Sequence, residues 1–438
     1  MATRNVIVEY RAAPELDRQA TSSASSLDAG PLEHLLAVDG IAFDLDFAPV
    51  RLPATGPYEP AEPGEPGPAV VVDPSPSRAH DAVAGVFSDP VVERCLTCLD
   101  SAAVGADTDV ERLLGVASLL DCELDGEGVV VAICDAGLNI EYLNSKGKRP
   151  TFWAEGSWGY DGRLPLGAMP VDHGTMCAFD ACIAAPACTL VDIALLRPLA
   201  GGLQGVLSDA VRAYSHLRDL LTGPLRPAGL KGLVVSNSWG MFHPSSDLPP
   251  RDPGNYSDNP NHPFNRAVAA LEALGADIVF AAGNCGAQCP DSRCQDVSTN
   301  AIYGANGHPS VLSVAGVDIN SERVGYSAIG PGRLADRKPD IAGYTHFKGS
   351  EVFDNDGGTS AACPVVAGAV AAVRTKRAYD AADPATSPAA IRALMTSTAR
   401  DLGAAGYDYE HGYGSVDGAK LRDEVCDEPS SGETPPPT

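Results

Sequence analysis

The chain has 438 residues, of which 57 are Asp or Glu and 31 are Lys or Arg, so its formal net charge is −26. This acidic balance repels phosphate backbones and argues against nucleic acid as a partner. Hydrophobic residues make up 44% of the chain, an ordinary share for a folded protein, which excludes a collagen-like or wholly disordered chain.

The N-terminal residues Met1–Arg11 contain an apolar run of only three residues, whereas a secretory signal needs roughly 7–15. No run approaches the roughly 18 apolar residues that span a membrane. We therefore expect a cytoplasmic protein whose twelve cysteines are thiols, with export by a route other than Sec as the alternative. Local disulfides in the loop from Cys285 to Cys294 are a second interpretation. Structural zinc is disfavoured because the second half of the usual ligand pattern is missing.

The ends of the chain differ in composition from its middle. Residues 1–50 are predicted to be a separate N-terminal segment, and residues 51–69 are so rich in Pro, Gly and Glu that they predict a linker. Residues 70–110 predict a strand-helix-strand unit, with strands at Ala69–Val72 and Val91–Val92 around a helix at Ser77–Val86. Residues 427–438 are acidic, carry three consecutive prolines and predict a disordered tail.

Between residues 111 and 426, short apolar runs alternate with helical patterns. The runs lie at 128–133, 190–196, 233–235, 276–280 and 311–314, and the clearest helical patterns at Ser208–Leu221 and Pro263–Leu274. Continuous β-branched runs separated by helices are typical of parallel strands buried on both faces. We therefore predict an α/β domain, a doubly wound parallel sheet covered by helices on both faces, with a small N-terminal α+β region.

Four polar residues follow these runs or open the helices after them: Asp135, His173, Asn284 and Ser360. In parallel α/β sheets, functional side chains lie just past the carboxyl ends of the strands. A serine needs a neutral imidazole to take its proton and a carboxylate to orient that imidazole, so Ser360, His173 and Asp135 fit nucleophilic acyl transfer. Asn284 and the start of the helix at Ser360 fit stabilisation of an oxyanion. Helix capping or close packing explains each position alone, but not all four together.

At these motifs the chain resembles the subtilisin-like serine peptidases, the subtilases. The matching motifs are Asp-x-Gly after an apolar strand, His-Gly-Thr, Ser-Asn-Ser-Trp-Gly at 236–240, Ala-Ala-Gly-Asn at 281–284 and Gly-Thr-Ser-x-Ala-x-Pro at 358–364. Their order, with the aspartate first and the serine last, is that of the subtilisin triad. The resemblance extends from Asp121 to about Leu421.

The resemblance implies that Ser360 is the nucleophile, His173 the general base and acid, Asp135 its orienting partner and Asn284 an oxyanion donor. It also implies that substrate backbone pairs with Ser238, Trp239 and Gly240, and that Ala281, Ala282 and Gly283 form the opposite wall of the first specificity pocket. Two departures from the family pattern, Ala136 and Ala361, affect pocket geometry but remove no catalytic group. Residues 285–306 look like an insertion that would cover or narrow the substrate groove.

We therefore expect a serine endopeptidase that hydrolyses peptide bonds through an acyl-enzyme, with the processing of a precursor as a candidate role. A peptide ligase or macrocyclase on the same fold is the first alternative, and a non-catalytic peptide-binding module is the second. The unit at 70–110 is predicted to be propeptide-like, with a permanent accessory domain as the alternative. The expected partner is a peptide or protein substrate, without nucleic acid, membrane or a required cofactor. Calcium as a structural ion and the oligomeric state stay open.

Overall fold

The computed structural model describes residues 5–10, 69–72, 83–89, 91–94, 101–199 and 202–426. Its main sheet is eight-stranded and parallel, in the order β15-β14-β13-β11-β5-β8-β6, with β7 also paired to β8. The strands are β5 (Val129–Asp135), β6 (Thr151–Phe152), β7 (Trp158–Gly159), β8 (Thr189–Ala194), β11 (Gly232–Asn237), β13 (Ala276–Ala281), β14 (Leu312–Val317) and β15 (Ile341–Tyr344).

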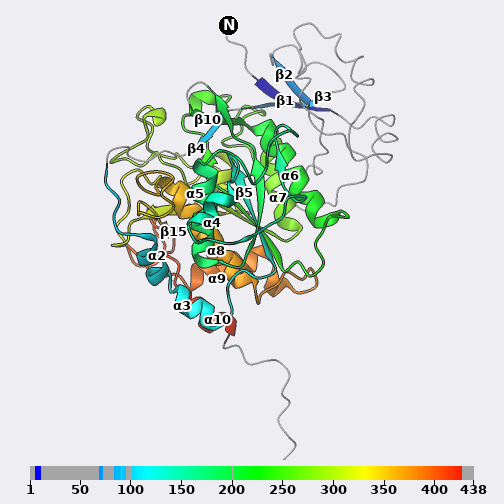
Figure 1. Ribbon diagram of the computed structural model, residues 1–438. Coiled ribbons are helices and arrows are strands. Elements are labelled where there is room, and N and C mark those ends of the chain that lie inside the picture. The colour runs from blue at the N-terminus through cyan, green and yellow to red at the C-terminus, as the bar shows by residue number, and fades with distance from the viewer. Residues whose placement is uncertain are drawn as a thin grey trace, which may run out of the picture.

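Helices cover both faces of this sheet, which confirms the doubly wound prediction (Figure 1). Alternate residues of β5 enter two separate cores: Val129, Val131 and Ile133 enter one, and Val130, Ala132 and Cys134 the other. Such a strand has no solvent face, and each fully buried aliphatic side chain stabilises the fold by roughly 1.5–3 kcal/mol. The first core is completed by α2 (Asp107–Leu114), α3 (Val116–Asp121), α4 (Ile140–Ser145), α5 (His173–Ala184), α8 (Gly358–Arg374), α9 (Pro388–Ser397) and α10 (Gly418–Cys426).

The second core is completed by α6 (Leu207–Thr222) and α7 (Pro263–Ala273), which match the two predicted helical patterns within one residue at each end. Short 3₁₀ turns follow in the loops: η2 (Pro244–Ser246), η3 (Ser292–Cys294), η4 (Gly304–Gly307) and η5 (Pro384–Thr386). Helix α2 crosses the predicted domain boundary after residue 110, because Val110 and Leu114 are both buried in the first core.

The described N-terminal residues form strands only, and they do not form the predicted strand-helix-strand unit. The strands β1 (Asn5–Tyr10), β2 (Ala69–Val72) and β3 (Val83–Ser88) make an antiparallel sheet in the order β2-β1-β3. The predicted helix at Ser77–Val86 is therefore wrong from Val83 onward, where pairing with β1 overrides the local helical pattern. The rest of that helix, the linker at 51–68 and the tail at 427–438 lie outside the described residues.

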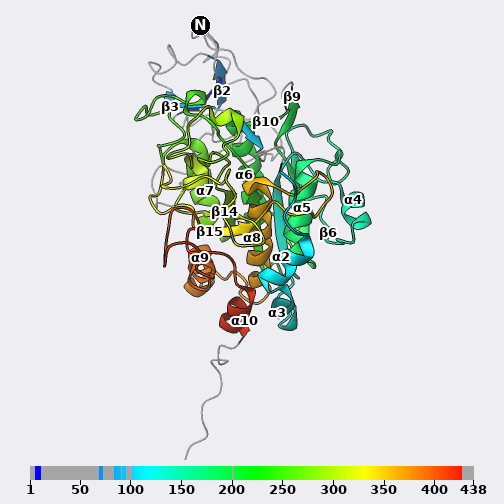
Figure 2. The same ribbon diagram turned by 90° about the vertical axis from the view of Figure 1, so that its left-hand side faces the viewer.

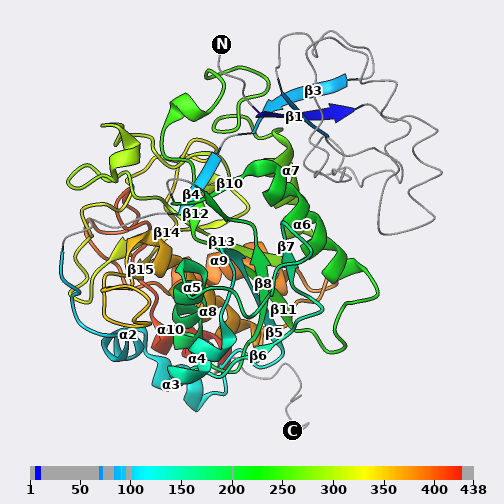
Figure 3. The same cartoon turned by 45° about the horizontal axis from the view of Figure 1, so that its top comes forward.

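The strand predicted at Val91–Val92 exists as β4 (Val91–Arg94), but it joins a different sheet. Its partners are β10 (Gly202–Val206) and β12 (Trp239–Gly240), in the order β12-β4-β10-β9, where β9 is Arg197–Leu199. Figure 3 looks onto this edge of the molecule, where β4 lies beside β10 and β12. Figure 2 shows β2 and β3 at one end of the molecule and α10 at the other.

Two disulfides between described residues correct the expectation that every cysteine is a thiol. Cys122 bonds to Cys426, and Cys285 bonds to Cys294, as the interpretation of local disulfides predicted. Among the described residues, five buried cysteines are thiols: Cys134, Cys177, Cys182, Cys188 and Cys363. Among the described residues, no helix is both long and apolar enough to cross a membrane.

Candidate active site

Asp135 and His173 form a buried pair at the carboxyl end of the main sheet. Asp135 is the last residue of β5 and His173 is the first residue of α5. The imidazole Nδ1 lies 2.9 Å from both carboxylate oxygens. Helix α5 approaches this closely because Gly174 has no side chain: a Cβ there would lie 2.5 Å from the carbonyl oxygen of Gly137. The pair fixes the imidazole ring and directs Nε2 away from the carboxylate.

Ser360 lies at the start of α8 in a backbone arrangement set by a proline four residues later. Pro364 has no N–H, so the carbonyl of Ser360 has no donor from the helix turn above it. The hydroxyl of Ser238 donates to this carbonyl at 2.9 Å, and the thiol of Cys177 donates at 3.6 Å. Gly358 starts the helix at φ 73°, a left-handed conformation that favours glycine. These contacts tie the main chain of Ser360 to the junction of β11 and β12 and to α5.

The proton-transfer contact from serine to histidine is not formed in this structure. The hydroxyl of Ser360 donates to the carbonyl of Ser238 at 3.3 Å, and His173 Nε2 has no hydrogen-bond partner among the described residues. Catalytic hydrogen bonds are often long or unformed before substrate binds. Ser360 is 0% exposed and His173 is 2% exposed, so both residues are shielded from solvent in this structure.

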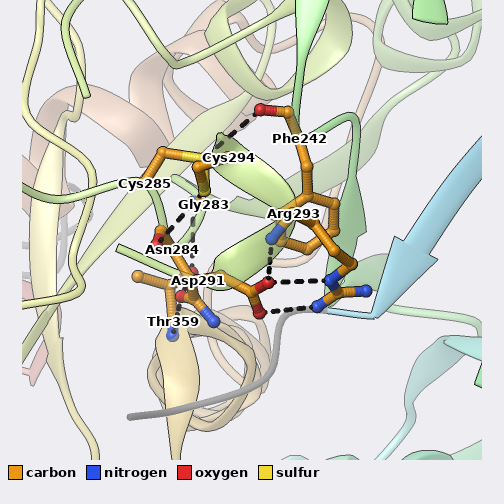
Figure 4. The surroundings of a disulfide bond; sticks show 8 residues. All are labelled: Phe242, Gly283, Asn284, Cys285, Asp291, Arg293, Cys294 and Thr359. Carbon is orange, nitrogen blue, oxygen red and sulfur yellow. Dashed lines mark hydrogen bonds and ion pairs between the residues drawn. A yellow bond between two sulfur atoms is a disulfide. The ribbon is translucent and has the colours of Figure 1, made fainter. Parts of the chain in front are cut away.

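Asn284 is oriented by Thr359, the residue before Ser360 (Figure 4). Its side-chain oxygen accepts hydrogen bonds from both the N–H and the hydroxyl of Thr359, each at 3.0 Å. The same hydroxyl accepts the N–H of Gly283 at 3.1 Å. Because Oδ1 is the acceptor for Thr359, the Nδ2 group is the donor that this amide can offer to an oxyanion.

The two predicted pocket walls are joined by Asn306, a residue that the sequence analysis did not select. Its Nδ2 donates to the carbonyls of Trp239 and Ala281, both at 2.8 Å. A Cβ on Gly240 would lie 2.8 Å from the same nitrogen, so a side chain there would displace the Asn306 amide. The indole of Trp239 is 0% exposed and packs against Phe280, with ring centroids 5.2 Å apart. The indole of Trp239 is therefore part of the core.

Cys177 is a second side chain that the sequence analysis missed. Its Sγ lies 3.8 Å from Asp135 Oδ2 and 3.8 Å from His173 Nδ1. Burial raises the pKa of the Cys177 thiol well above its usual range, and the nearby Asp135 charge raises it further, so the group is a neutral donor to the carboxylate. Its position four residues after His173 on one helix face is the signal that would have found it.

The same three side chains, from Asp135, His173 and Cys177, are the group among the described residues whose ligand atoms lie close enough to hold a metal ion. Carboxylate, imidazole and thiolate together suit a soft or borderline ion such as Zn²⁺. An ion held there would replace the Asp135–His173 hydrogen bond and the thiol proton. Such an ion would therefore compete with the proton transfer that this pair is arranged to support.

Comparison with known proteins identifies the family of this chain. The model of the subtilase family matches residues 126–414, and the chain belongs to that family of serine peptidases. Subtilisin DY from Bacillus licheniformis is 32% identical over 156 residues, which cover 36% of this chain. The matched region spans about half of that relative, 51% of its length.

Proposed function

We propose that this chain is a serine endopeptidase that binds an extended peptide between β10 and β12 and cleaves it at Ser360. The observation that carries the proposal is the position of β4. It pairs antiparallel with both strands, with Glu93 opposite Gln204 on one side and Gly240 on the other. Arg94 lies opposite Trp239, so β4 runs toward Ser238, whose carbonyl accepts the hydroxyl of Ser360. A segment of the chain itself thus lies as a substrate would, directed at the nucleophile.

The reaction follows from the groups around Ser360. His173 Nε2 takes the hydroxyl proton while Asp135 holds the Nδ1–H, and Ser360 Oγ attacks the peptide carbonyl. The negative charge that develops on the carbonyl oxygen is met by Asn284 Nδ2 and by the N–H of Ser360 at the start of α8. His173 then protonates the leaving amine, and a water molecule repeats the cycle on the acyl-enzyme. The proposal uses these side chains alone and requires no cofactor.

The N-terminal strands are the first substrate and the first inhibitor in this proposal. While β4 fills the cleft, Ser360 and His173 are covered, so peptides in solution are excluded. Two contacts hold the preceding residues to the peptidase domain. The ring of Phe87 packs edge-on against His262, with centroids 5.7 Å apart. Asp89 accepts the N–H and the hydroxyl of Ser208, at 3.0 and 3.1 Å, at the start of α6. These contacts support a propeptide-like role and a processing activity.

Incubation of the purified full-length chain tests this proposal. We expect intact-mass spectrometry to show the loss of an N-terminal fragment that contains β1–β4, and a fluorogenic peptide to be hydrolysed only as this fragment appears. The Ser360→Ala variant should stay intact. A chain that hydrolyses peptides while keeping its N-terminus would make the N-terminal strands a permanent accessory domain. A chain that hydrolyses nothing would refute the peptidase function itself. Products formed with an added amine nucleophile would distinguish a ligase from a hydrolase.

The docking of Asp89 should depend on pH. Burial raises the pKa of Asp89 to about 7, although the Ser208 hydrogen bonds lower it, and the charge of Asp209 adds to the rise. Asp209 is itself paired with Arg197 and Arg212. A released, exposed aspartate has a pKa of about 3.9. The docked carboxyl therefore binds its proton more tightly than the released one. Docking should be strongest below about pH 4 and should weaken as the pH rises through about 7.

Amide hydrogen exchange at β4 measures this effect in the Ser360→Ala variant, in which the segment is not cleaved. After correction for the intrinsic exchange rate, protection of β4 should fall on the order of 10- to 100-fold between pH 5 and pH 8. The Asp89→Asn variant should lose most of this slope. Protection that rises with pH would contradict the assignment of Asp89.

We also propose an oxidising compartment in place of the cytoplasm, because two disulfides join described residues and such bonds are rare in a reducing cytosol. Alkylation of free thiols followed by mass spectrometry tests this assignment on chain purified from its native compartment.

A further inference from the structure

The Cys285–Cys294 disulfide closes a loop that starts at the residue directly after Asn284 (Figure 4). Both cysteines are buried, at 2% and 0% exposure. From the far side of this loop, the N–H of Asp291 donates to the carbonyl of Asn284 at 3.0 Å. The Sγ of Cys294 lies 3.7 Å from the same oxygen. The main chain of the oxyanion residue is therefore held from inside the disulfide loop.

The same loop contacts the opposite side of the cleft. The carboxylate of Asp291 accepts the N–H of Arg293 and forms a two-pronged ion pair with its guanidinium, at 2.9 and 2.8 Å. That guanidinium stacks on the ring of Phe242, 3.7 Å from the ring centroid. The Sγ of Cys285 lies 3.5 Å from the carbonyl of Phe242, two residues beyond the wall strand β12. The loop thus bridges Asn284 and the chain that continues from the substrate-binding strand.

We propose that the Cys285–Cys294 disulfide is a positioning element of the oxyanion hole. The side chain of Asn284 is oriented by Thr359, and its carbonyl accepts the N–H of Asp291, which belongs to a surface loop with little regular structure of its own. The disulfide and the Arg293–Phe242 stack limit the conformations of that loop, and so hold the Asn284 amide where it meets the oxyanion. Preorganised donors of this kind lower the barrier because they need no rearrangement during the reaction. The inference rests on the proposed peptidase function.

The test compares two disulfides in the full-length chain. The double variant Cys285→Ala, Cys294→Ala removes the loop closure, while Cys122→Ala, Cys426→Ala removes the remote bond between the ends of α3 and α10. Cys289, inside the loop, also forms a disulfide, which both variants retain. Active sites are counted by fluorophosphonate titration. We expect the first variant to lose about tenfold in kcat with KM within about twofold, since a misplacement of about 1 Å can cost on the order of 10²-fold. The second should keep kcat within about twofold, whatever its thermal stability.

A second comparison separates positioning from general stability. In an Asn284→Ala background the donor is already gone, so removing the Cys285–Cys294 bond should change kcat by less than about twofold. An equal loss of kcat in both backgrounds, or no loss in either, would overturn the proposal. If the double variant does not fold, Asp291→Asn, which weakens the ion pair with Arg293, replaces it. This variant should lower kcat by a smaller factor in the wild-type background and leave kcat unchanged in the Asn284→Ala background. A wild-type chain without activity would refute the proposed function and leave this comparison without a baseline, so the two failures are distinguishable.

Discussion

Replacement of Ser360 by alanine should abolish hydrolysis and fluorophosphonate labelling while leaving the fold intact. The hydroxyl donates to the carbonyl of Ser238 over a long distance of 3.3 Å, so the loss of this hydrogen bond costs little stability. The position is held instead by its own carbonyl, which accepts the Ser238 hydroxyl in either variant. The expected loss is on the order of 10⁶ in kcat, a scale borrowed from nucleophile removal in a subtilisin, a member of this family.

Ser313→Ala is the matched control for this experiment. Ser313 is as buried as Ser360 but lies within β14, where its hydroxyl has no partner among the described residues. The control should be labelled and should turn over substrate at the wild-type rate, and both variants should unfold near the wild-type temperature. Persistent labelling of Ser360→Ala would show that another serine is the nucleophile.

The parts of the fold and site that sequence predicted are those fixed by local pattern. The runs that became β5, β11, β13 and β14 are mostly apolar because both faces of each strand are buried, and this leaves a clear signal. The proposed triad could be predicted from the sequence for the same reason. Its members follow strand ends or open helices, and parallel strands bring those positions to one edge of the sheet.

What sequence did not predict depends on contacts between distant residues. The bond from Cys122 to Cys426 spans 304 residues, and no local spacing relates its two cysteines. The first four residues of β3, Val83–Val86, are predicted as helix because a short apolar stretch is ambiguous until its partner, here β1, is known. The amide of Asn306 joins two walls that are far apart in the chain, so its sequence neighbours give no sign of its position.

Removal of the Asn284 amide should slow turnover far more than it weakens binding. The donor meets a charge that exists only during the reaction, so Asn284→Ala should lower kcat on the order of 10²–10³ and change KM little. That scale is borrowed from the equivalent change in subtilisin itself. The variant should also be less stable, because the N–H and hydroxyl of Thr359 lose their buried acceptor, a cost of roughly 1–3 kcal/mol. Fluorophosphonate should still label Ser360, but more slowly.

Asn265→Ala provides the matched control, since it removes another buried amide whose Nδ2 donates to two main-chain carbonyls, those of Tyr256 and Asn259. It should lower the unfolding temperature to a similar extent while kcat per active site stays at the wild-type value. Thermal unfolding and kcat, measured on the same titrated sample, then distinguish the loss of stability from the loss of turnover. An Asn284→Ala enzyme that is destabilised but turns over at the wild-type rate would reduce this residue to a turn-forming role. The oxyanion would then depend on the N–H of Ser360 and the start of α8 alone.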